Sequence, residues 1–352
     1  MVENLKIIEL STVLAGPSVG MFFAELGAEV IKIENPTTGG DITRKWHQPK
    51  EKKSDQSAYF SCVNWGKKHF FLDFKNPIDF SKLKQLIQEA NIVITNFKNG
   101  DAEKFNLTFE DCKKINPTLI YGHIGGFKSI PKRVAFDAVV QAETGFISMN
   151  GQPDADGVKM PVALMDILAA HQLKEGILVA LLKQNSSKRA FHVSTTLEES
   201  GYASLANQAS NFLMNSFIPE RIGSLHPNIA PYGEKIITCD KKEYLLAIGT
   251  EKQFKDFAKF IGLDNELIIK FDSNQKRVEN RLELLTHIQH KVSSMNSAHF
   301  FNSCIELNIP IGEVKTMKDV FKNPVAKKMV LEEKIKNQQT KRIATIAFTI
   351  KG

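Results

Sequence analysis

The sequence predicts an α/β protein with an open, Rossmann-like parallel sheet in a large domain and a second, smaller α+β domain. Short apolar segments rich in β-branched residues alternate with helical segments over the first 125 residues. This alternation is typical of a parallel sheet covered by helices. From about Ser224 the pattern changes to two short strands and a run of helices, which indicates a separate unit.

The elements of the sheet can be placed one by one. Strands are expected at five apolar segments, residues 5–10, 29–34, 69–74, 91–97 and 118–124. Helices are expected where apolar residues recur with helical spacing, at residues 17–27, 79–90 and 166–183. Residues 189–213 then predict one more strand and one more helix. Pro17 suits the first turn of its helix, because an N–H at that position would have no partner within the helix.

The second part of the chain has its own pattern. Residues 226–263 predict a hairpin followed by a helix, and residues 280–308 predict further helices. Residues 309–329 predict a connection back to the first domain. We therefore expect a large α/β domain, a linker, a small α+β domain and a return segment, at residues 1–200, 201–225, 226–315 and 316–352.

Composition argues against several classes of protein. The formal net charge is +7, and residues 322–342, which supply much of the excess, predict a solvated surface. No aromatic–basic pattern indicates nucleic-acid binding, and no apolar run reaches the length of a membrane span. We therefore expect a cytoplasmic protein with neither nucleic acid nor membrane as partner. The four cysteines lack a paired spacing, so neither a metal site nor a disulfide is predicted.

The glycines of the first domain do not match a dinucleotide site. NAD binding requires a G-x-G-x-x-G pattern directly after the first strand, whereas this turn reads STVLAGPSVG. Glu34 closes the second strand, where such sites place an acid, but a single acid is weak support. Another group, Gly122, Gly125 and Gly126, follows the strand at 118–124. Its N–H groups either face a phosphate or a developing oxyanion, or only form a tight turn.

One acidic residue lies in an otherwise apolar helix. Asp166 is near the start of the segment MPVALMDILAAHQLKEGILVALL, residues 160–182. Either Asp166 caps a buried helix, or the helix presents a reactive carboxylate. The residues of this segment alone leave both interpretations open.

Several segments, taken in order, resemble the class III CoA-transferases, a superfamily of carnitine and formate CoA-transferases that also contains the α-methylacyl-CoA racemases. They include NLKIIELSTVLAGPSVGMFFAELGAEVIKIENPTTGGDITR, VNWGKKHFFLDFKNP, FDAVVQAETGFISMNG, VALMDILAAHQLKEGILVALL and HPNIAPYG, and the match covers roughly residues 4–350. The resemblance implies that the large domain binds CoA and that two subunits form an interlocked homodimer. It also implies transfer of CoA between an acyl-CoA and a carboxylic acid, without a metal or NAD.

The resemblance implies roles for single residues. Asp166 falls on the family's catalytic aspartate, which forms a covalent intermediate, and a helix N-terminus favours its ionised, nucleophilic form. Lys98 stands where an arginine is usual, so it keeps the charge but loses the forked geometry. The residues implied to contact CoA or the reacting oxyanion are Ala15, Gly16, Pro17, Arg44, Lys75, Lys98, Gly125, Gly126, Phe136 and Asp137.

Two alternatives to a transferase follow from the same resemblance. The racemases have a catalytic histidine at the position of Phe136, and phenylalanine cannot exchange a proton. Glu251 does match a racemase carboxylate, so an α-methylacyl-CoA racemase or epimerase is the first alternative. A non-catalytic acyl-CoA-binding protein is the second. The family's glycine-rich lid and usual C-terminal segment are not recognised here, which predicts a different closure of the pocket.

Overall fold

The computed structural model describes residues 2–52, 56–335 and 338–351. These residues form two compact units. The first contains residues 1–147, 159–219 and 324–352, and the second contains residues 148–158 and 220–323. Each unit packs around an apolar core of its own.

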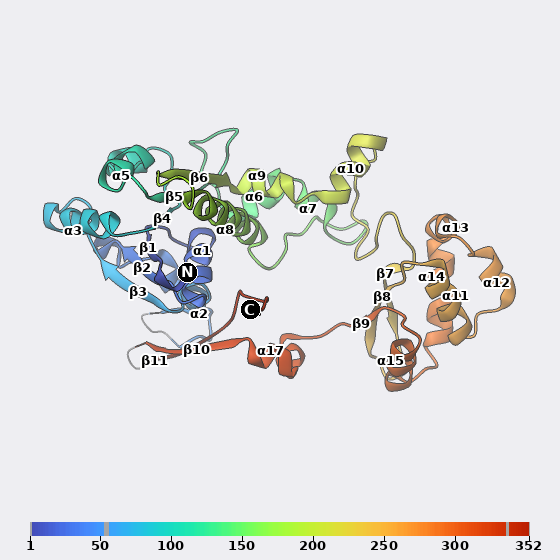
Figure 1. Cartoon of the computed structure of the whole chain (residues 1–352). Coiled ribbons are helices and arrows are strands. Elements are labelled where there is room, and N and C mark those ends of the chain that lie inside the picture. Colours follow the sequence, from blue (N-terminus) through green and yellow to red (C-terminus); the bar gives the residue numbers. More distant parts are fainter. Residues whose placement is uncertain (1, 53–55, 336–337, 352) are drawn as a thin grey trace. The chain divides into compact units, whose positions relative to one another are not determined.

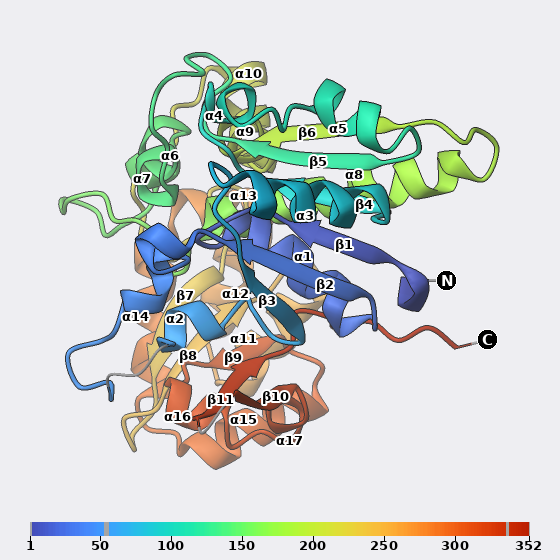
Figure 2. The same ribbon diagram turned by 90° about the vertical axis from the view of Figure 1, so that its left-hand side faces the viewer.

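Within the described residues, the first unit is built on a parallel sheet of six strands, and this confirms the predicted sheet. Its order is β3-β2-β1-β4-β5-β6, and each neighbouring pair is parallel. Figure 2 shows the strands side by side. The strand order reverses between β1 and β4, and open sheets of this kind bind ligands beyond the carboxyl ends of their strands. The strands are β1 (Lys6–Glu9), β2 (Glu29–Glu34), β3 (Lys67–Phe71), β4 (Ile92–Thr95), β5 (Ile120–Gly125) and β6 (Phe191–Thr196).

Helices cover both faces of this sheet (Figure 1). On one face α1 (Ala15–Glu25) and α8 (Leu164–Gln184) pack against buried strand residues such as Ile7 and Ile120. On the other face α3 (Pro77–Gln88) and α5 (Phe109–Ile115) pack against Ile8 and Val93. The shorter elements of this unit are η1 (Val2–Asn4), η2 (Pro36–Thr38), η3 (Ile42–Lys45), α2 (Ala58–Ser61), α4 (Asp101–Lys104), α6 (Asp137–Glu143), α7 (Phe146–Met149), α9 (Leu197–Ala203), α10 (Ala206–Asn215) and α17 (Pro324–Lys328).

Helix α8 closely matches the helix predicted at 166–183. Ala169, Leu173 and Ile177 recur at four-residue intervals and are fully buried, as expected for one face of a packed helix. Gly176 lets the helix approach β6 closely, because a Cβ at this position would lie 2.5 Å from Cγ1 of Val193. These contacts fix the middle of α8 against the sheet.

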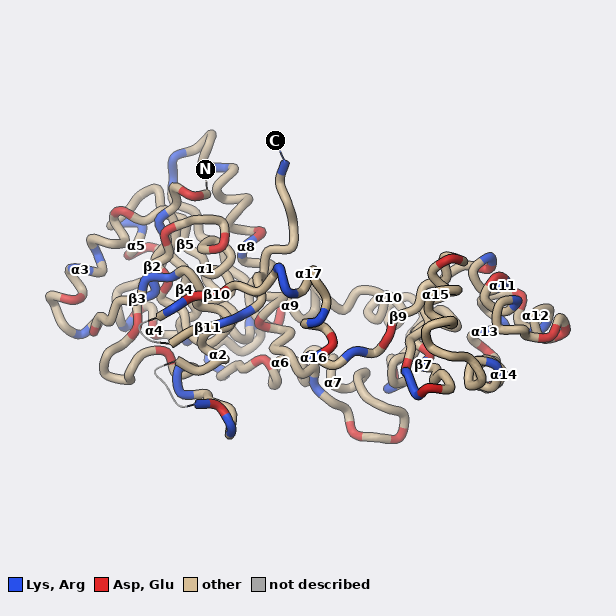
Figure 3. Tube along the Cα trace, turned by 90° about the horizontal axis from the view of Figure 1, so that it is seen from below, with Lys and Arg blue, Asp and Glu red and all other residues tan. Residues whose placement is uncertain are grey.

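The prediction that residues 322–342 form only a solvated surface is incomplete. The segment is strongly basic and its described lysines are exposed, but it also forms the antiparallel hairpin of β10 (Val330–Ile335) and β11 (Gln338–Ile343). Arg342 is buried, and its Nη1 donates to the carbonyl of Ser61 at 2.6 Å. Figure 3 shows Lys and Arg along β2, β3 and this hairpin, with acidic residues between them. The basic residues are therefore spread over the unit.

The second unit contains a small antiparallel sheet and several helices. The predicted hairpin is present as β7 (Tyr232–Ile237) and β8 (Glu243–Ala247), and β9 (Ile311–Glu313) adds to it within the segment predicted as a connection. Four fully buried phenylalanines, Phe254, Phe257, Phe271 and Phe300, fill its core. Its helices are α11 (Glu251–Phe260), α12 (Asn265–Lys270), α13 (Asn274–Glu279), α14 (Arg281–Val292), α15 (Ser297–Glu306) and α16 (Met317–Val320). Of the helices in the described part of the chain, none has the length and apolar composition that crossing a membrane requires.

Candidate active site

Asp166 lies in the first turn of α8, and its side chain is almost completely buried. The residue is 8% exposed. Across the described ranges, no group forms a hydrogen bond with its carboxylate. The residue before the helix, Ala163, offers no side-chain cap either. A buried carboxylate without a hydrogen-bonded partner is costly, and such groups cluster at functional sites.

The N-terminus of α8 is capped from another helix. Asp137, the first residue of α6, accepts a hydrogen bond at Oδ1 from the N–H of Met165 at 2.7 Å. Its Oδ2 accepts one from Nε2 of Gln141 at 2.7 Å, and Oε1 of Gln141 accepts one from the N–H of Met160 at 2.8 Å. Asp166 is therefore not a cap, and the interpretation of the sequence in which it only caps the helix is wrong.

The surroundings of Asp166 raise the pKa of its carboxyl group. Burial raises this pKa, and the negative charge of Asp137 adds to the effect, so that it moves from 3.8 to about 7. The expected preference of a helix N-terminus for the ionised form is outweighed by these two effects. Near neutral pH the carboxyl group therefore exchanges readily between its protonated and its nucleophilic form.

Tyr59, which the sequence analysis did not single out, lies within range of the charge of Asp166. Burial raises the pKa of Tyr59 to about 12, with the charge of Asp166 as the next contribution, so the phenol keeps its proton. The rings of Tyr59 and Trp46 meet edge to face, with centroids 5.1 Å apart. Tyr59 also belongs to an apolar cluster with Val13 and Ile167. Side chains from the β1–α1 turn, from α2 and from α8 therefore pack together at the start of α8.

The residues Ala15, Gly16 and Pro17 begin α1 and are buried. No residue larger than glycine fits at position 16, because a Cβ there would lie 2.3 Å from Cβ of Ser11. The turn before them leaves the carboxyl end of β1, at the edge of the sheet where a ligand is expected. Since α1 and α8 pack on the same face, these residues and Asp166 belong to the same side of the sheet.

The glycines after β5 lie next to the segment that leads to α6. Gly125 ends β5, and a Cβ on Gly126 would lie 2.4 Å from Cβ of Ala135. Only glycine therefore allows this close approach. Phe136 precedes α6 and is 54% exposed, whereas Asp137 reaches α8. Of the predicted residues, the structure thus joins Asp137 to the turn that holds Asp166.

The three basic residues predicted to contact CoA have different surroundings. Arg44 donates from Nε and Nη2 to the carboxylate of Glu34 at 2.7 and 2.5 Å, and its guanidinium lies 3.8 Å from the ring centroid of Phe60. These contacts engage Arg44 within the fold. Lys75 and Lys98 are exposed in the loops that follow β3 and β4. Both lysines therefore present their charge to solvent at the carboxyl edge of the sheet.

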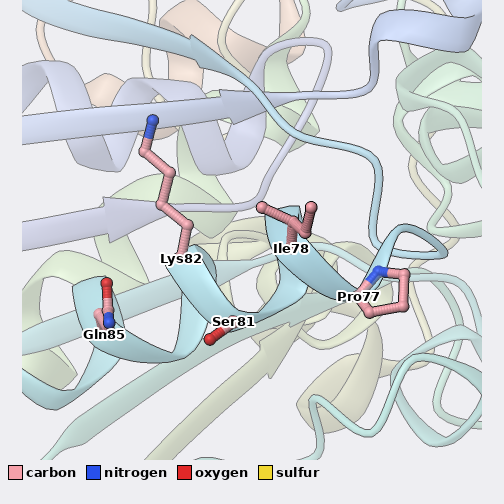
Figure 4. Close-up of a pocket in the computed structure, with 5 residues that line it drawn as sticks. All are labelled: Pro77, Ile78, Ser81, Lys82 and Gln85. Carbon is pink, nitrogen blue, oxygen red and sulfur yellow. The ribbon is translucent and has the colours of Figure 1, made fainter.

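The structure also has a shallow hollow that is not a candidate site. It is lined by one face of α3, with the side chains of Pro77, Ile78, Ser81, Lys82 and Gln85 (Figure 4). None of these side chains is among the predicted residues, and the hollow contains no carboxylate, thiol or imidazole. Among the described residues, no group of three or more His, Cys, Asp or Glu is arranged to hold a metal ion.

Two of the residues around Asp166 escaped the sequence analysis for a physical reason. Tyr59 lies in a short helix that begins at the N-cap Ser57, and a lone aromatic residue there has no functional signature. Gln141 is fully buried, but its role depends on the side chain of Asp137 and on the N–H of Met160. Only tertiary packing brings these groups together.

Comparisons with known proteins agree with one another. The model of CoA-transferase family III matches residues 2–352. The succinate–glutarate CoA-transferase of Agrobacterium fabrum is 33% identical over 333 residues, which are 92% of this chain and 82% of that protein. The human succinyl-CoA:glutarate CoA-transferase is 30% identical over 327 residues, 92% of this chain and 73% of that protein. The crystal structure of a CAIB/BAIF family protein from Brucella suis is similar with a TM-score of 0.83 and 32% identity, covering 99% of this chain and 92% of that chain.

Proposed function

The chain belongs to CoA-transferase family III, and on that premise we propose that Asp166 is the residue that receives the acyl group. The enzyme transfers CoA between acyl-CoA and carboxylic acids. The observation that supports the role of Asp166 is its buried carboxylate, which has no hydrogen-bonded partner in the described ranges and a pKa of about 7. An aspartate with a purely structural role is expected to form hydrogen bonds through its carboxylate, and Asp166 forms none within the described ranges.

The reaction takes place in two halves. The ionised carboxylate of Asp166 attacks the thioester carbon of the acyl-CoA, giving a mixed anhydride and CoA thiolate. The thiolate attacks the Asp166 carbonyl carbon, giving an aspartyl–CoA thioester and the donor acid. The acceptor carboxylate then attacks this thioester and releases the thiolate. Attack of the thiolate on the acceptor's carbonyl carbon gives the new acyl-CoA and restores Asp166.

Each of these steps passes through an oxyanion and an intermediate that water can hydrolyse. The backbone N–H groups near Gly125 and Gly126, and those at the start of α1, are the proposed donors to the oxyanion and to CoA. The phenol of Tyr59 keeps its proton at neutral pH, so it can donate to a nearby oxygen. The apolar cluster at the start of α8 supports the exclusion of water.

We propose four- and five-carbon dicarboxylates as the substrate class. Similar proteins are named as CoA-transferases of succinate and glutarate, and a further one as a succinyl-CoA:mesaconate CoA-transferase. The test gives the purified enzyme succinyl-CoA together with a panel of acceptor acids, and identifies the new acyl-CoA by mass spectrometry. Transfer to glutarate at a rate well above that to monocarboxylates is the expected result. Transfer only to monocarboxylates would contradict the class.

The racemase alternative has less support. A two-base racemase needs a proton donor on each face of the α-carbon, and Phe136 supplies none. Glu251 accepts hydrogen bonds from Nη1 of Arg277 at 2.6 Å and from the N–H of Asn274 at 2.9 Å. The bond to Arg277 lowers the pKa of Glu251, and this outweighs its partial burial. Glu251 is therefore ionised at neutral pH and is a poor source of a proton.

We also propose that two chains form the interlocked homodimer implied by the resemblance, each with a large CoA-binding domain and a smaller domain. Helix α10 has no buried residue, and Leu213 and Met214 on it are 78% and 80% exposed. Large apolar side chains of this kind need a partner surface. Light scattering at micromolar concentration tests the proposal. A stable dimer is expected, and an active monomer would contradict it.

A further inference from the structure

Val13, in the turn between β1 and α1, has a conformation that its side chain disfavours. Its φ is 71°, in the left-handed region. A β-branched residue is rarely found there, because its side chain crowds the backbone, and such a conformation persists only where neighbouring groups impose it. The N–H of Val13 donates to Oδ2 of Asp41 at 3.1 Å and to Oδ1 at 3.4 Å. Asp41 is therefore the group that holds Val13 in place.

Asp41 is itself fixed by several contacts. It is 1% exposed, and its Oδ1 accepts hydrogen bonds from the N–H and the hydroxyl of Thr43 at 3.0 and 2.8 Å. Its Oδ2 lies 3.2 Å from Nζ of the fully buried Lys32. Its own N–H donates to Oε2 of Glu34 at 2.9 Å. A buried carboxylate held at this many points is a rigid acceptor.

The neighbours of Val13 in the turn are held in the same way. The carbonyl of Ser11 accepts a hydrogen bond from Nζ of Lys32 at 2.7 Å. The N–H of Thr12 donates to Oδ1 of Asn96 at 3.0 Å, and its carbonyl accepts from Nδ2 of the same residue at 2.8 Å. Three consecutive residues are thus fixed through their backbone by side chains from other segments. The turn has a defined shape even though Val13 disfavours it.

This turn borders the proposed nucleophile. The side chains of Val13 and Leu14 belong to the apolar cluster that contains Tyr59, Ala163 and Ile167. Ala163 and Ile167 flank Asp166 in sequence, and the charge of Asp166 acts on Tyr59. A change in the backbone of Val13 therefore displaces the apolar side chains of this cluster, against which an acyl group at Asp166 would rest.

We propose that Asp41 is a positioning residue for CoA transfer. By holding Val13 in its left-handed conformation, Asp41 keeps the apolar cluster beside Asp166 in place. The inference rests on the proposed role of Asp166 as nucleophile. Asp41 touches no reacting atom in this account. Its effect on the rate acts through Val13, because a small displacement of a group that orients the substrate lowers the rate of the chemical step.

The test combines substitutions at both positions in the full chain. Asp41→Asn removes the charge that faces Lys32 and one of the two acceptor oxygens. We expect it to lower kcat at least about tenfold, with a much smaller change in KM, and to slow formation of the adduct at Asp166 by the same factor. Adding Val13→Gly should recover most of that loss, because glycine adopts a positive φ without strain. Adding Val13→Ala should not, although it shortens the side chain almost as much.

Two controls separate this role from a general loss of stability. Asp111→Asn alters another capping aspartate, which lies on α5 and on the opposite face of the sheet. This substitution should lower stability but leave kcat unchanged, so adding Val13→Gly should have no loss of kcat to restore. Thr43→Val removes only the hydroxyl that orients Asp41. If Asp41→Asn yields no folded protein, Thr43→Val should give the same pattern of repair with a smaller initial loss.

The outcomes are distinct. Repair by Val13→Gly and not by Val13→Ala supports the inference. Full kcat in Asp41→Asn, equal repair by both Val13 substitutions, or no repair by either would overturn it. If the unmodified enzyme itself forms no adduct at Asp166, the proposed function fails. If the unmodified enzyme and Asp41→Asn form the adduct equally fast, only the inference about Asp41 fails.

Discussion

Oδ1 of Asp137 accepts a hydrogen bond at 2.7 Å from the backbone N–H of Met165, so the helix that presents Asp166 is capped by an acid from a different helix. The two roles that the sequence left open for one carboxylate are thereby divided between two. Asp137 orders the N-terminus of α8, and its charge also raises the pKa of Asp166. The site uses one acid to position and tune the other.

The first prediction concerns the pH dependence of the reaction. The nucleophile must be ionised, so kcat/KM should rise with pH through the pKa of Asp166 at about 7. Asp137→Asn keeps an oxygen that can accept the hydrogen bond from Met165 but removes the negative charge. The midpoint of the profile should therefore move to lower pH. Kinetics between about pH 5 and pH 9 measure it, and an unchanged or higher midpoint would exclude this influence of Asp137.

The second prediction concerns stability. The folded protein keeps a proton on Asp166 up to a pH of about 7, whereas the unfolded chain releases it near pH 4. Between these values the folded state binds more protons, so stability falls as the pH rises. Asp166→Asn removes this penalty. Relative to the unmodified enzyme, it should gain up to about 4 kcal/mol in free energy of unfolding between about pH 4 and pH 8. Urea denaturation at both pH values checks this, and a gain that does not depend on pH would contradict it.

The third prediction concerns Arg44 and Lys98, which the family resemblance implies are both contacts of CoA but which have different surroundings in the structure. Arg44→Ala leaves Glu34 buried without its main partner and should cost about 3 kcal/mol of stability. Lys98→Ala should leave stability unchanged and raise KM for acyl-CoA, because this exposed charge is proposed to meet a phosphate. Thermal melting and kinetics are measured on both. An unchanged KM at normal stability would remove Lys98 from the CoA site.

These cases illustrate how much the sequence predicts. The parallel sheet and α8 follow from apolar segments whose spacing and length are local properties, and the structure confirms them. The acid in the first turn of α8 could be singled out, because one carboxylate in an apolar helix is conspicuous. Its partner Asp137 was singled out by resemblance, but its contact with Met165 joins residues 28 positions apart. No local pattern encodes that contact.

Other features depended on tertiary structure for the same reason. The left-handed Val13 has no signature in the sequence, since a valine there looks like any apolar residue. Its conformation becomes intelligible only when Asp41 is seen to accept its N–H. The sequence does not predict the hairpin of β10 and β11, because β11 (QQTKRI) has a single apolar residue and the apolar residues of β10 (VLEEKI) do not alternate with polar ones. The burial of Arg342 in β11 depends on its tertiary contact with the carbonyl of Ser61, which no local pattern in the sequence indicates.

The fourth prediction concerns the racemase alternative. With a 2-methylacyl-CoA in deuterium oxide, a racemase exchanges the α-proton with solvent through an enolate. Phe136 cannot take part in that exchange, and both oxygens of Glu251 are engaged, by hydrogen bonds from Nη1 of Arg277 and from the N–H of Asn274. Incorporation of deuterium should therefore stay near the uncatalysed rate, as followed by mass spectrometry. Rapid exchange would favour the racemase.

The central claim is tested most directly by locating the covalent intermediate. The enzyme is incubated with acyl-CoA and hydroxylamine, which converts an activated carboxyl group to a hydroxamate, and the modified residue is identified by peptide mass spectrometry. Asp166 should be modified only when acyl-CoA is present, with a matching loss of transfer. Asp166→Asn serves as the control, and its transfer rate should fall at least about 1,000-fold while the fold persists. Modification confined to another residue, or full transfer by Asp166→Asn, would contradict the assignment of Asp166 as the nucleophile.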